Sequence, residues 1–348
     1  MGENFIKILN IMYGAKFGGA EKFFERFSIA AHKSKIFKLK VFIKTNKKRF
    51  STIKQEGVDV CQTSCLGIND FWFRKKLIGI CKEFKPNILF SWMNRASNYL
   101  PEKRLNNEIK VGRLGGFYKL KNYINCDYLV ANTPDIKKYI IESGWEKNKV
   151  IYLPNFVDDP GKQKNEILEN LKKNENKILL GVGRFHKNKG FEFLIKALSY
   201  LKNYHLCLVG EGILKTEYLN SAKKMAVENR LHIFDWCDSV SEFYNSADIL
   251  VCSSIVEPLG NIIIEGWAHQ IPVVSANIMG PKFLIRNKFN GLKYKSESLS
   301  SFIDSIKLVE DKTLKKKIIY NGYMKYKDCF SRTNVLNQYQ SFFEKIVK

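Results

Sequence analysis

Residues 247–265 read ADILVCSSIVEPLGNIIIE, and this stretch decides the fold. An apolar run, Ile249–Cys252, leads into a Pro-Leu-Gly-Asn turn, and an apolar helical segment follows from about Asn261 to His269. A strand, a turn and a helix in this order are typical of a parallel α/β sheet. Such a turn presents backbone N–H groups at the start of a helix, where anions bind. The stretch therefore predicts an α/β fold with an anion site after this strand.

Two carboxylates flank the turn. Glu265 lies four residues after Asn261 and shares its helix face, so it would face the part of a ligand that lies beyond a phosphate held at the first turn. A ribose diol suits that carboxylate. Glu257, ahead of the turn, would lie on the other side of the phosphates, where a sugar is expected. The arrangement predicts a nucleotide-sugar clamp, although ordinary α/β proteins also contain such turns without a site.

Short apolar segments alternate with helical patterns along the whole chain. Strands are predicted at Ile6–Ile11, Leu39–Ile43, Ile88–Trp92, Val111–Leu114, Tyr128–Ala131, Val150–Leu153, Ile178–Val182, His205–Val209, Leu231–Phe234, Ile249–Cys252 and Val273–Ser275. Helices are predicted at Glu21–Ala31, Phe71–Phe84, Pro134–Ser143, Phe191–Leu201, Leu214–Asn229 and Ser298–Val309. Continuous apolar strands separated by helices indicate two doubly wound parallel sheets.

The length of 348 residues exceeds one typical core and predicts two domains. The polar stretch 158–177 has no strand pattern, so we place a linker there, between a first domain at 1–157 and a nucleotide-sugar-binding domain at 178–325. Residues 326–348 are expected to form a helix that packs back on the first domain. Ligands of such folds bind beyond the carboxyl ends of the strands, so a cleft between the domains is the expected site.

Composition limits the class of protein. The chain is 45% hydrophobic, contains no uncharged apolar run long enough to span a membrane, and begins without a signal-peptide pattern, so a soluble cytoplasmic protein is expected. Its eight cysteines form no CxxC pair, and Cys61 and Cys65 have no His or Cys partners nearby for a metal site. Reduced, structural thiols are the prediction.

The net charge of +24 is unevenly distributed. Residues 1–155 carry 29 Lys and Arg against 13 Asp and Glu, a net charge of +16, and the remainder carries +8. A basic surface attracts nucleic acid, anionic lipid or a phosphorylated substrate. A general abundance of Lys, Asn and Ile is the alternative explanation, in which the charge has no function.

Three further segments follow predicted strands. In YGAKFGGAE, residues 13–21, Gly18 and Gly19 open a helix without side chains, so the backbone can approach a diphosphate; the GxGxxG pattern of nicotinamide enzymes is absent. In GRFHKNKG, residues 183–190, Arg184 and Lys189 can converge on phosphates, unless they belong to a solvated basic loop. Gly210 and Gly212, in GEG, would let the chain pass close to a nucleotide.

Taken together and in this order, these elements resemble family 4 glycosyltransferases, retaining enzymes of the GT-B fold. The matching motifs are GGAE at 18–21, NFVD at 155–158, GRFHKNKG at 183–190, GEG at 210–212 and EPLGNIIIE at 257–265. The resemblance implies the following donor contacts: Gly19 to the donor, Arg184 and Lys189 to its diphosphate, Glu265 to the ribose, Glu257 with the backbone of Leu259, Gly260 and Asn261 to the sugar, and the chain from Trp236 to Val240 to the base.

SWMNRAS at 91–97, VGRLGGFYKLKNY at 111–123 and NTPDIKKYIIESGW are similar to bacterial transferases of lipopolysaccharide core or related cell-surface glycans. Asn94, Arg95 and Arg113 are therefore acceptor-side candidates. Many relatives carry a His after the strand near Val111, where this chain has Arg113-Leu114-Gly115-Gly116, which puts a histidine role in doubt. Arg113 either takes the place of that histidine as a cation facing the donor or forms a structural salt bridge.

A retaining mechanism of this kind needs no dedicated nucleophile, and no Ser/His/Asp or glycosidase-type carboxylate pair stands out in the sequence. We expect front-face displacement by a metal-independent hexosyltransferase, with Arg184, Lys189 and Glu257 as catalytic residues, no metal ligands and no cofactor besides the donor. His32, His205, His232 and His269 show no metal-site spacing, and His186 is expected to be a loop residue near the phosphates.

The acceptor, a lipid-linked or cell-surface glycan, is expected on the basic first domain. The sequence Asp70-Phe71-Trp72-Phe73-Arg74-Lys75-Lys76 mixes aromatic and basic residues, as at a membrane interface, or else its aromatic residues enter the core. The loop 44–49 (KTNKKR) would assist on an anionic membrane. One rival is a nucleotide-sugar epimerase, or a transferase with an intracellular sugar acceptor, which would share the fold and the donor site. The other is a nucleic-acid-binding protein; no recognition motif accompanies the charge, so no nucleic-acid partner is expected.

Overall fold

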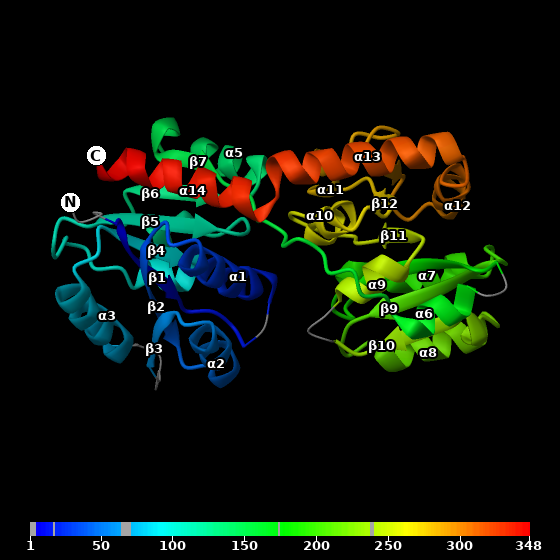
Figure 1. Cartoon of the computed structure of the whole chain (residues 1–348), viewed down its shortest axis with the longest axis horizontal. Coiled ribbons are helices and arrows are strands. Elements are labelled where there is room, and N and C mark those ends of the chain that lie inside the picture. Colours follow the sequence, from blue (N-terminus) through cyan, green and yellow to red (C-terminus); the bar gives the residue numbers. More distant parts are fainter. Residues whose placement is uncertain (1–4, 17, 64–70, 173–174, 237–239) are drawn as a thin grey trace. The chain divides into compact units, whose positions relative to one another are not determined.

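The computed structural model describes residues 5–16, 18–63, 71–172, 175–236 and 240–348. The chain divides into two compact units. Unit 1 comprises Met1–Asn155 and Arg332–Lys348, and unit 2 comprises Phe156–Ser331. Each unit is built on one parallel sheet with helices on both faces (Figure 1). The predicted class, doubly wound α/β in both halves, is confirmed.

The described part of unit 1 contains a sheet with the strand order β3-β2-β1-β4-β5-β6-β7. The strands are β1 (Lys7–Met12), β2 (Lys38–Lys44), β3 (Asp59–Thr63), β4 (Ile88–Trp92), β5 (Ile109–Leu114), β6 (Tyr128–Ala131) and β7 (Val150–Tyr152). The helices are α1 (Gly19–Lys33), α2 (Lys47–Gln55), α3 (Phe71–Phe84), α4 (Met93–Asn98), α5 (Pro134–Glu142) and α14 (Arg332–Val347).

The central strands β1 and β4 of this sheet are buried on both faces, which explains their apolar runs. Leu9 and Ile11 of β1 point to the side that carries α3 and α5. Asn10, between them, points to the side of α1, where its amide donates to Ser28 Oγ at 2.9 Å and its Oδ1 accepts from Trp92 Nε1 at 2.6 Å. A buried amide in a strand thus has its hydrogen-bond partners.

The C-terminal helix α14 belongs to unit 1. Its Tyr339 ring lies 4.8 Å from Phe27 of α1, and Phe343 lies 5.4 Å from Phe90 of β4. This helix begins at Arg332, later than the expected start at residue 326, because α13 (Lys312–Cys329) continues past that position within unit 2. The chain passes from one unit to the other between Ser331 and Arg332.

The described part of unit 2 contains a sheet with the strand order β10-β9-β8-β11-β12-β13. The strands are β8 (Lys177–Val182), β9 (Tyr204–Val209), β10 (Leu231–Phe234), β11 (Ile249–Cys252), β12 (Val273–Ala276) and β13 (Leu292–Tyr294). The helices besides α13 are α6 (Glu166–Leu171), α7 (Phe191–Leu198), α8 (Lys215–Lys224), α9 (Ser241–Ser246), α10 (Asn261–Ala268), α11 (Pro281–Leu284) and α12 (Leu299–Leu308).

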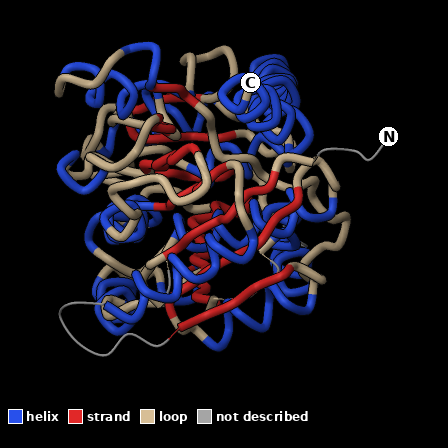
Figure 2. The backbone as a smooth tube through the Cα atoms, turned by 90° about the vertical axis from the view of Figure 1, so that its left-hand side faces the viewer, coloured by secondary structure: helices blue, strands red, loops and turns tan. Residues whose placement is uncertain are grey.

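Two apolar clusters cover the two faces of this sheet. One packs α7, α8 and α12 against residues such as Leu206 and Val251. The other packs α6, α9, α10 and α13 against residues such as Leu180 and Leu250. Figure 2 faces unit 1 and shows the same arrangement there, with strands running between helices.

The stretch expected to be a linker, 158–177, is instead part of unit 2. Asn245 Nδ2 donates to the carbonyls of Gly161 (2.7 Å) and Gln163 (2.8 Å), and Ser246 Oγ accepts from Asn165 N at 2.8 Å. Asn165 caps α6, and Leu168 is fully buried in the core. The polar composition of this stretch therefore masks a short helix that packs on the core through Leu168 and Leu171.

Loop 44–49 is a second correction. Only Thr45 and Asn46 lie outside regular elements, because Lys44 ends β2 and Lys47 starts α2 with Asn46 as a side-chain cap. Arg49 is 3% exposed; its Nε donates to Glu25 Oε1 at 3.0 Å. Arg49 is therefore unavailable to a membrane surface.

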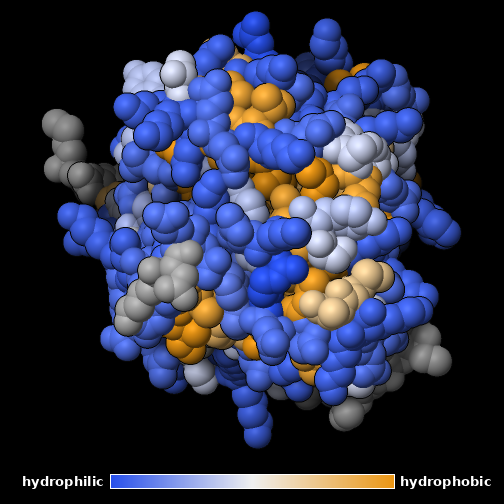
Figure 3. Space-filling model, turned by 90° about the vertical axis from the view of Figure 1, so that its right-hand side faces the viewer, coloured by the Kyte–Doolittle hydropathy of each residue, from blue (hydrophilic) through white to orange (hydrophobic). Residues whose placement is uncertain are grey.

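The surface shown in Figure 3 is mainly hydrophilic, with hydrophobic side chains in separate patches. No described helix is both long and apolar enough to cross a membrane. Burial raises the pKa of Cys81, Cys126 and Cys207 to about 12, so these thiols stay protonated and unreactive. Cys65 lies outside the described residues.

His205 and His232 pair across β9 and β10, and they make the stability of unit 2 pH-dependent. Their ring nitrogens lie 2.9 Å apart. Burial, with Arg230 nearby, lowers the pKa of His205, and burial, with His205 nearby, lowers the pKa of His232. In the folded protein both pKa values lie below the unfolded value near 6.5. The contribution of these histidines to the free energy of unfolding is therefore fully present above about pH 6.5, and it is lost as the pH falls toward the folded pKa values.

We expect the melting temperature to fall by several degrees between about pH 7 and about pH 5. In the double variant His205→Asn/His232→Asn this decrease should be smaller. Scanning calorimetry over that range checks the prediction, and an unchanged slope in the variant would contradict it.

Candidate active site

The candidate site of unit 2 lies where the strand order reverses. β8 and β11 are neighbours, with Leu179 paired to Ile249 and Leu180 to Leu250, and their connections run to opposite sides of the sheet. Ligands of doubly wound sheets bind at this switch point, beyond the carboxyl ends of the strands. The segments 183–190 and 253–260 follow these two strands, so the sequence motifs with Arg184, Lys189 and Glu257 meet here.

The two segments lie against each other through their backbones. Ser253 Oγ donates to Lys189 O at 2.8 Å, and Ile255 N donates to Asn188 O at 2.8 Å. Gly190 has a φ of +64°, and a Cβ at this position would collide with Ser253 O. A glycine here is required both by the left-handed backbone and by the close approach of the neighbouring strand end.

Gly190→Ala is expected to lower the free energy of unfolding by at least about 2 kcal/mol, because Ala is strained at this φ and its methyl group has no room. Gly19→Ala is the matched control for stability, since a Cβ at Gly19 would meet nothing within 4 Å. Urea denaturation of the two variants measures the difference. Equal stabilities would show that the contact between Gly190 and Ser253 does not constrain these loops.

Lys189 and Glu257 form the charged centre of this site. Lys189 Nζ lies 2.5 Å from Glu257 Oε2, and their side chains are 22% and 15% exposed. Glu257 Oε1 accepts from Gly260 N at 3.3 Å, and Ser254 Oγ lies 3.4 Å from Oε2. The carboxylate therefore lies at the start of α10, where the helix dipole favours negative charge.

The other residues expected to hold a donor lie in the two segments after β8 and β11 and in α10. Leu259 is buried, and Gly260 precedes α10 at a φ of +85°. Asn261 begins the helix, and Glu265, one turn later, is half-buried. Arg184 is exposed in the 183–190 segment. These residues present a guanidinium, an ammonium group, two carboxylates and a helix start at one edge of one sheet.

Gly210 and Gly212 allow a close contact within unit 2, which is a second reason for these glycines besides the expected approach of a nucleotide. A Cβ at Gly210 would collide with Gly183 O, and a Cβ at Gly212 would collide with the backbone of Phe185. Phe185 N also donates to Glu211 O at 2.7 Å. The missing side chains therefore let the GEG segment pack against the segment that carries Arg184.

Trp236 and Val240 flank residues 237–239, which lie outside the described residues. Trp236 is 46% exposed just after β10, and Val240 is half-buried just before α9. The part of the base-contact prediction that concerns Cys237, Asp238 and Ser239 therefore has no structural description.

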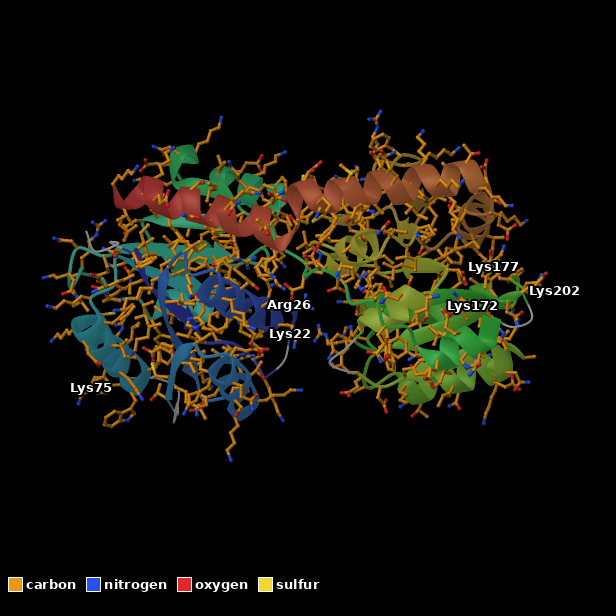
Figure 4. The ribbon with its side chains drawn as sticks, in the orientation of Figure 1. Lys22, Arg26, Lys75, Lys172, Lys177 and Lys202 are labelled. Carbon is orange, nitrogen blue, oxygen red and sulfur yellow. The ribbon has the colours of Figure 1, made fainter. Side chains whose placement is uncertain are left out.

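In unit 1 the glycine-rich segment after β1 is shaped by Glu21. This carboxylate is 4% exposed, and its Oε1 accepts from Ala15 N at 2.8 Å. A Cβ at Gly18 would collide with Glu21, whereas Gly19 has open space around it. Gly18 is thus a packing requirement, and Gly19 is the position where the backbone is open to a ligand. Lys22 and Arg26 of α1, labelled in Figure 4, follow it.

Asn94 and Arg95 follow β4, next to β1 in the sheet, and so lie at the switch point of unit 1. Asn94 is half-buried and Arg95 is exposed. Met93, before them, has a φ of +66°, which is costly for a residue with a side chain and is common at functional turns.

The environment of Arg113 differs from both expectations drawn from the sequence. It is 2% exposed inside unit 1. Its guanidinium donates to Asn155 Oδ1 (2.5 Å) and to Tyr339 Oη (3.1 Å), and it lies over the Trp92 ring at 4.4 Å. Arg113 is therefore neither an exposed acceptor-side cation nor a partner in a described salt bridge. It joins the sheet to α14.

The sequence did not reveal several contacts of these sites. Tyr244 Oη donates to Glu265 Oε2 at 2.7 Å. Gly280, at a φ of +72°, leaves room for the backbone of Glu257 and Pro258. The Met-Gly-Pro sequence after the Val273–Ser275 strand is a turn signal that could have indicated Gly280; Tyr244 has no comparable signal. Among the described residues, no group of three or more His, Cys, Asp or Glu could hold a metal ion.

Comparison with known proteins identifies the family. Residues 162–325 match the family model described as "Glycosyl transferases group 1". The lipopolysaccharide core biosynthesis glycosyltransferase LpsE of Rhizobium meliloti is 30% identical over 269 residues, which cover 76% of this chain and 77% of LpsE. The chain belongs to the group 1 glycosyltransferases.

Two further similarities cover nearly the whole glycosyltransferase. LpsD of Rhizobium meliloti, also named a lipopolysaccharide core biosynthesis glycosyltransferase, is 24% identical over 344 residues, 98% of both chains. The structure of Anabaena Alr3699/HepE in complex with UDP and glucose superimposes with a TM-score of 0.81 at 17% identity, over 98% of this chain and 100% of that one. The predicted GT-B fold is confirmed.

Proposed function

We propose that this glycosyltransferase is a retaining family 4 enzyme that transfers a sugar from a nucleoside-diphosphate sugar to a hydroxyl of a lipopolysaccharide core or another cell-surface glycan. The relatives' names support this acceptor class. The observation that carries the donor assignment is the pair Lys189–Glu257 at the start of α10, beside the segment with Arg184. Cations and a helix start together favour a diphosphate.

In this proposal Arg184 and Lys189 bind the diphosphate of the donor. Charge on the diphosphate increases as the bond from the sugar C1 to the phosphate oxygen breaks, so fixed cations stabilise the transition state more than the ground state. Glu257 then faces the sugar, whose C1 becomes positive. Glu265 accepts hydrogen bonds from the ribose hydroxyls.

The acceptor attacks C1 from the face that the diphosphate leaves. The new bond joins the acceptor oxygen to C1, and the hydroxyl proton passes to an oxygen of the departing phosphate. The configuration at C1 is therefore retained, and no protein nucleophile is needed. Positioning and electrostatics supply the rate.

A coupled assay for release of the nucleoside diphosphate tests this function. The donor panel starts with UDP-sugars, each with and without core oligosaccharide from a lipopolysaccharide; proton NMR of the product reports the anomeric configuration. We expect acceptor-dependent release and retention. An inverted product would overturn the mechanism, and conversion of the donor to an isomeric nucleotide sugar without acceptor would instead indicate an epimerase.

We also propose that the enzyme needs neither a divalent metal nor another cofactor, because Arg184 and Lys189 can neutralise the diphosphate. An excess of EDTA should leave the rate unchanged. Loss of activity with EDTA and its recovery with Mg²⁺ or Mn²⁺ would contradict this proposal.

We propose that the enzyme works at the cytoplasmic face of the inner membrane and attaches through the start of α3. Phe71 and Trp72 are 66% and 59% exposed, whereas Phe73 is buried. Lys75 Nζ lies 5.4 Å from the centroid of the Trp72 ring (Figure 4 labels Lys75). Exposed aromatic rings beside ammonium groups suit an anionic interface. Asp70 of this motif lies outside the described residues.

Sedimentation with phosphatidylglycerol vesicles at low salt tests the attachment. The double variant Phe71→Ala/Trp72→Ala should bind at least about fivefold more weakly, because two interfacial rings are lost. Tyr320→Ala, which removes an aromatic ring that is 64% exposed on α13, is the control and should bind as the wild type does. Equal binding by all three proteins would contradict this attachment site.

A further inference from the structure

The Glu265 carboxylate is hydrogen-bonded to another side chain of unit 2. Its Oε2 accepts a hydrogen bond of 2.7 Å from Tyr244 Oη, which comes from a different helix, α9. Tyr244 is 2% exposed, so its hydroxyl reaches the carboxylate from inside the protein. The half-buried carboxylate is therefore held from its inner side.

Tyr244 is itself fixed by His269, at the end of α10. The two rings stack with centroids 4.7 Å apart and an angle of 24° between their planes. His269 Nδ1 lies 2.7 Å from the backbone oxygen of Glu265, which can only accept, so Nδ1 carries the proton. His269 Nε2 then accepts from Ser241 Oγ at 2.8 Å.

These contacts link α9 to α10 and form a second clamp, distinct from the predicted nucleotide-sugar clamp. Its members are Ser241, Tyr244, Glu265 and His269. Burial lowers the pKa of His269, despite the opposing influence of Glu265, and this keeps the ring neutral at neutral pH, as the two hydrogen bonds require. Ser241 directly follows Val240, so the clamp also fixes the chain at one end of the segment expected to contact the base.

A glutamate side chain has several rotatable bonds, and a ligand that requires one orientation must stop their motion. A carboxylate can accept about four hydrogen bonds. The bond from Tyr244 uses one of these positions, on Oε2. Holding the carboxylate before the nucleotide arrives removes part of the entropy cost of binding.

We propose that Tyr244 is a positioning residue for nucleotide binding, which orients the Glu265 carboxylate and is itself held by His269 and Ser241. This inference rests on the proposed role of Glu265 at the ribose. It predicts that loss of the Tyr244 hydroxyl weakens nucleotide binding. The rate of the chemical step depends instead on the residues around Lys189.

Isothermal titration with UDP, ADP, GDP and CDP tests the proposal, using the nucleotide that the wild type binds best. Tyr244→Phe removes only the hydroxyl and should raise the Kd about tenfold, the value of one hydrogen bond to a charged group. In the transfer assay the donor KM should rise similarly, while kcat stays within about twofold. Ser241→Ala, one contact further away, should raise the Kd about threefold.

Tyr204→Phe is the matched control. Tyr204 is also a buried tyrosine of unit 2, and its hydroxyl donates to a glutamate, Glu310, at 2.9 Å. Tyr204 begins β9, so it lies at the amino ends of the strands, whereas the candidate site lies at their carboxyl ends. Both Phe variants should lose a similar amount of stability, and only Tyr244→Phe should lose affinity. Equal Kd values for the two variants would overturn the positioning role. If Glu265→Ala also binds the nucleotide normally, the ribose assignment itself fails.

Discussion

Replacing Lys189 by Met is expected to lower kcat by about 10²–10³-fold, a larger effect than the loss of this charge has on binding of the donor. Lys189 Nζ lies 2.5 Å from Glu257, at the edge of the sheet where β8 and β11 diverge. Methionine keeps the length of the side chain and removes the charge. The loss falls on the transition state because negative charge on the leaving diphosphate is greatest there.

Lys187→Met is the matched control for this experiment. Lys187 lies in the same segment, two residues earlier, and is exposed. Its replacement should change kcat by no more than about twofold, because an exposed lysine away from the reacting atoms contributes little. Steady-state kinetics with the preferred donor compare the two. Equal effects would mean that general positive charge of the segment, and not the position of Lys189, supports transfer.

Replacing Arg113 by Met is expected to lower the free energy of unfolding of unit 1 by about 3 kcal/mol, because a buried guanidinium with two hydrogen bonds and two ring contacts is lost. The donors to Asn155 and Tyr339 disappear, as do the contacts with Phe23 and Trp92. For a unit of this size the melting temperature should fall by about 6–12 °C.

Arg95→Met provides the comparison within the same unit. Arg95 is exposed, so its replacement should change stability by no more than about 0.5 kcal/mol. Scanning calorimetry measures the melting temperature of both variants. If Arg113→Met melts at the temperature of Arg95→Met, Arg113 does not anchor α14 as described.

Strands that are buried on both faces could be predicted from the sequence. Ile88–Trp92, Tyr128–Ala131 and Ile249–Cys252 have the predicted bounds, because their mainly apolar runs admit few other structures. The edge strand Leu231–Phe234, which is less buried, also has the predicted bounds. β3 (Asp59–Thr63) and β13 (Leu292–Tyr294) were missed. Both are short edge strands, and their sequences, DVCQT and LKY, contain polar residues that weaken the apolar pattern.

The candidate site could be predicted as far as backbone topology determines it. Lys189 and Glu257 lie together because the strands before them are neighbours at a switch point, and the order of strands and helices indicates that topology. The contact of Tyr244 with Glu265 depends on how two helices pack on one face. No spacing in the sequence encodes that packing.

Glycines and buried charges were the least predictable features. Gly210 carries no side chain because Gly183 lies against it, a long-range contact that a local turn signal does not contain. Arg113 lies near the end of β5, whose sequence is IKVGRL, and a functional cation and a buried anchor look alike at such a position in sequence. Its partners Asn155 and Tyr339 are far away in the chain, and only the fold brings them together.

The central claim is that unit 2 binds a nucleoside diphosphate with Glu265 on the ribose. A thermal-shift panel with UDP, ADP, GDP and CDP measures this most directly, with wild type, Glu265→Ala and Glu217→Ala, an exposed glutamate of α8, as control. At about 100 times its Kd the preferred nucleotide should stabilise the wild type by about 2.7 kcal/mol. Glu217→Ala should keep that shift and Glu265→Ala should lose it. If no nucleotide shifts the wild type, or if Glu265→Ala keeps the full shift, the account is contradicted.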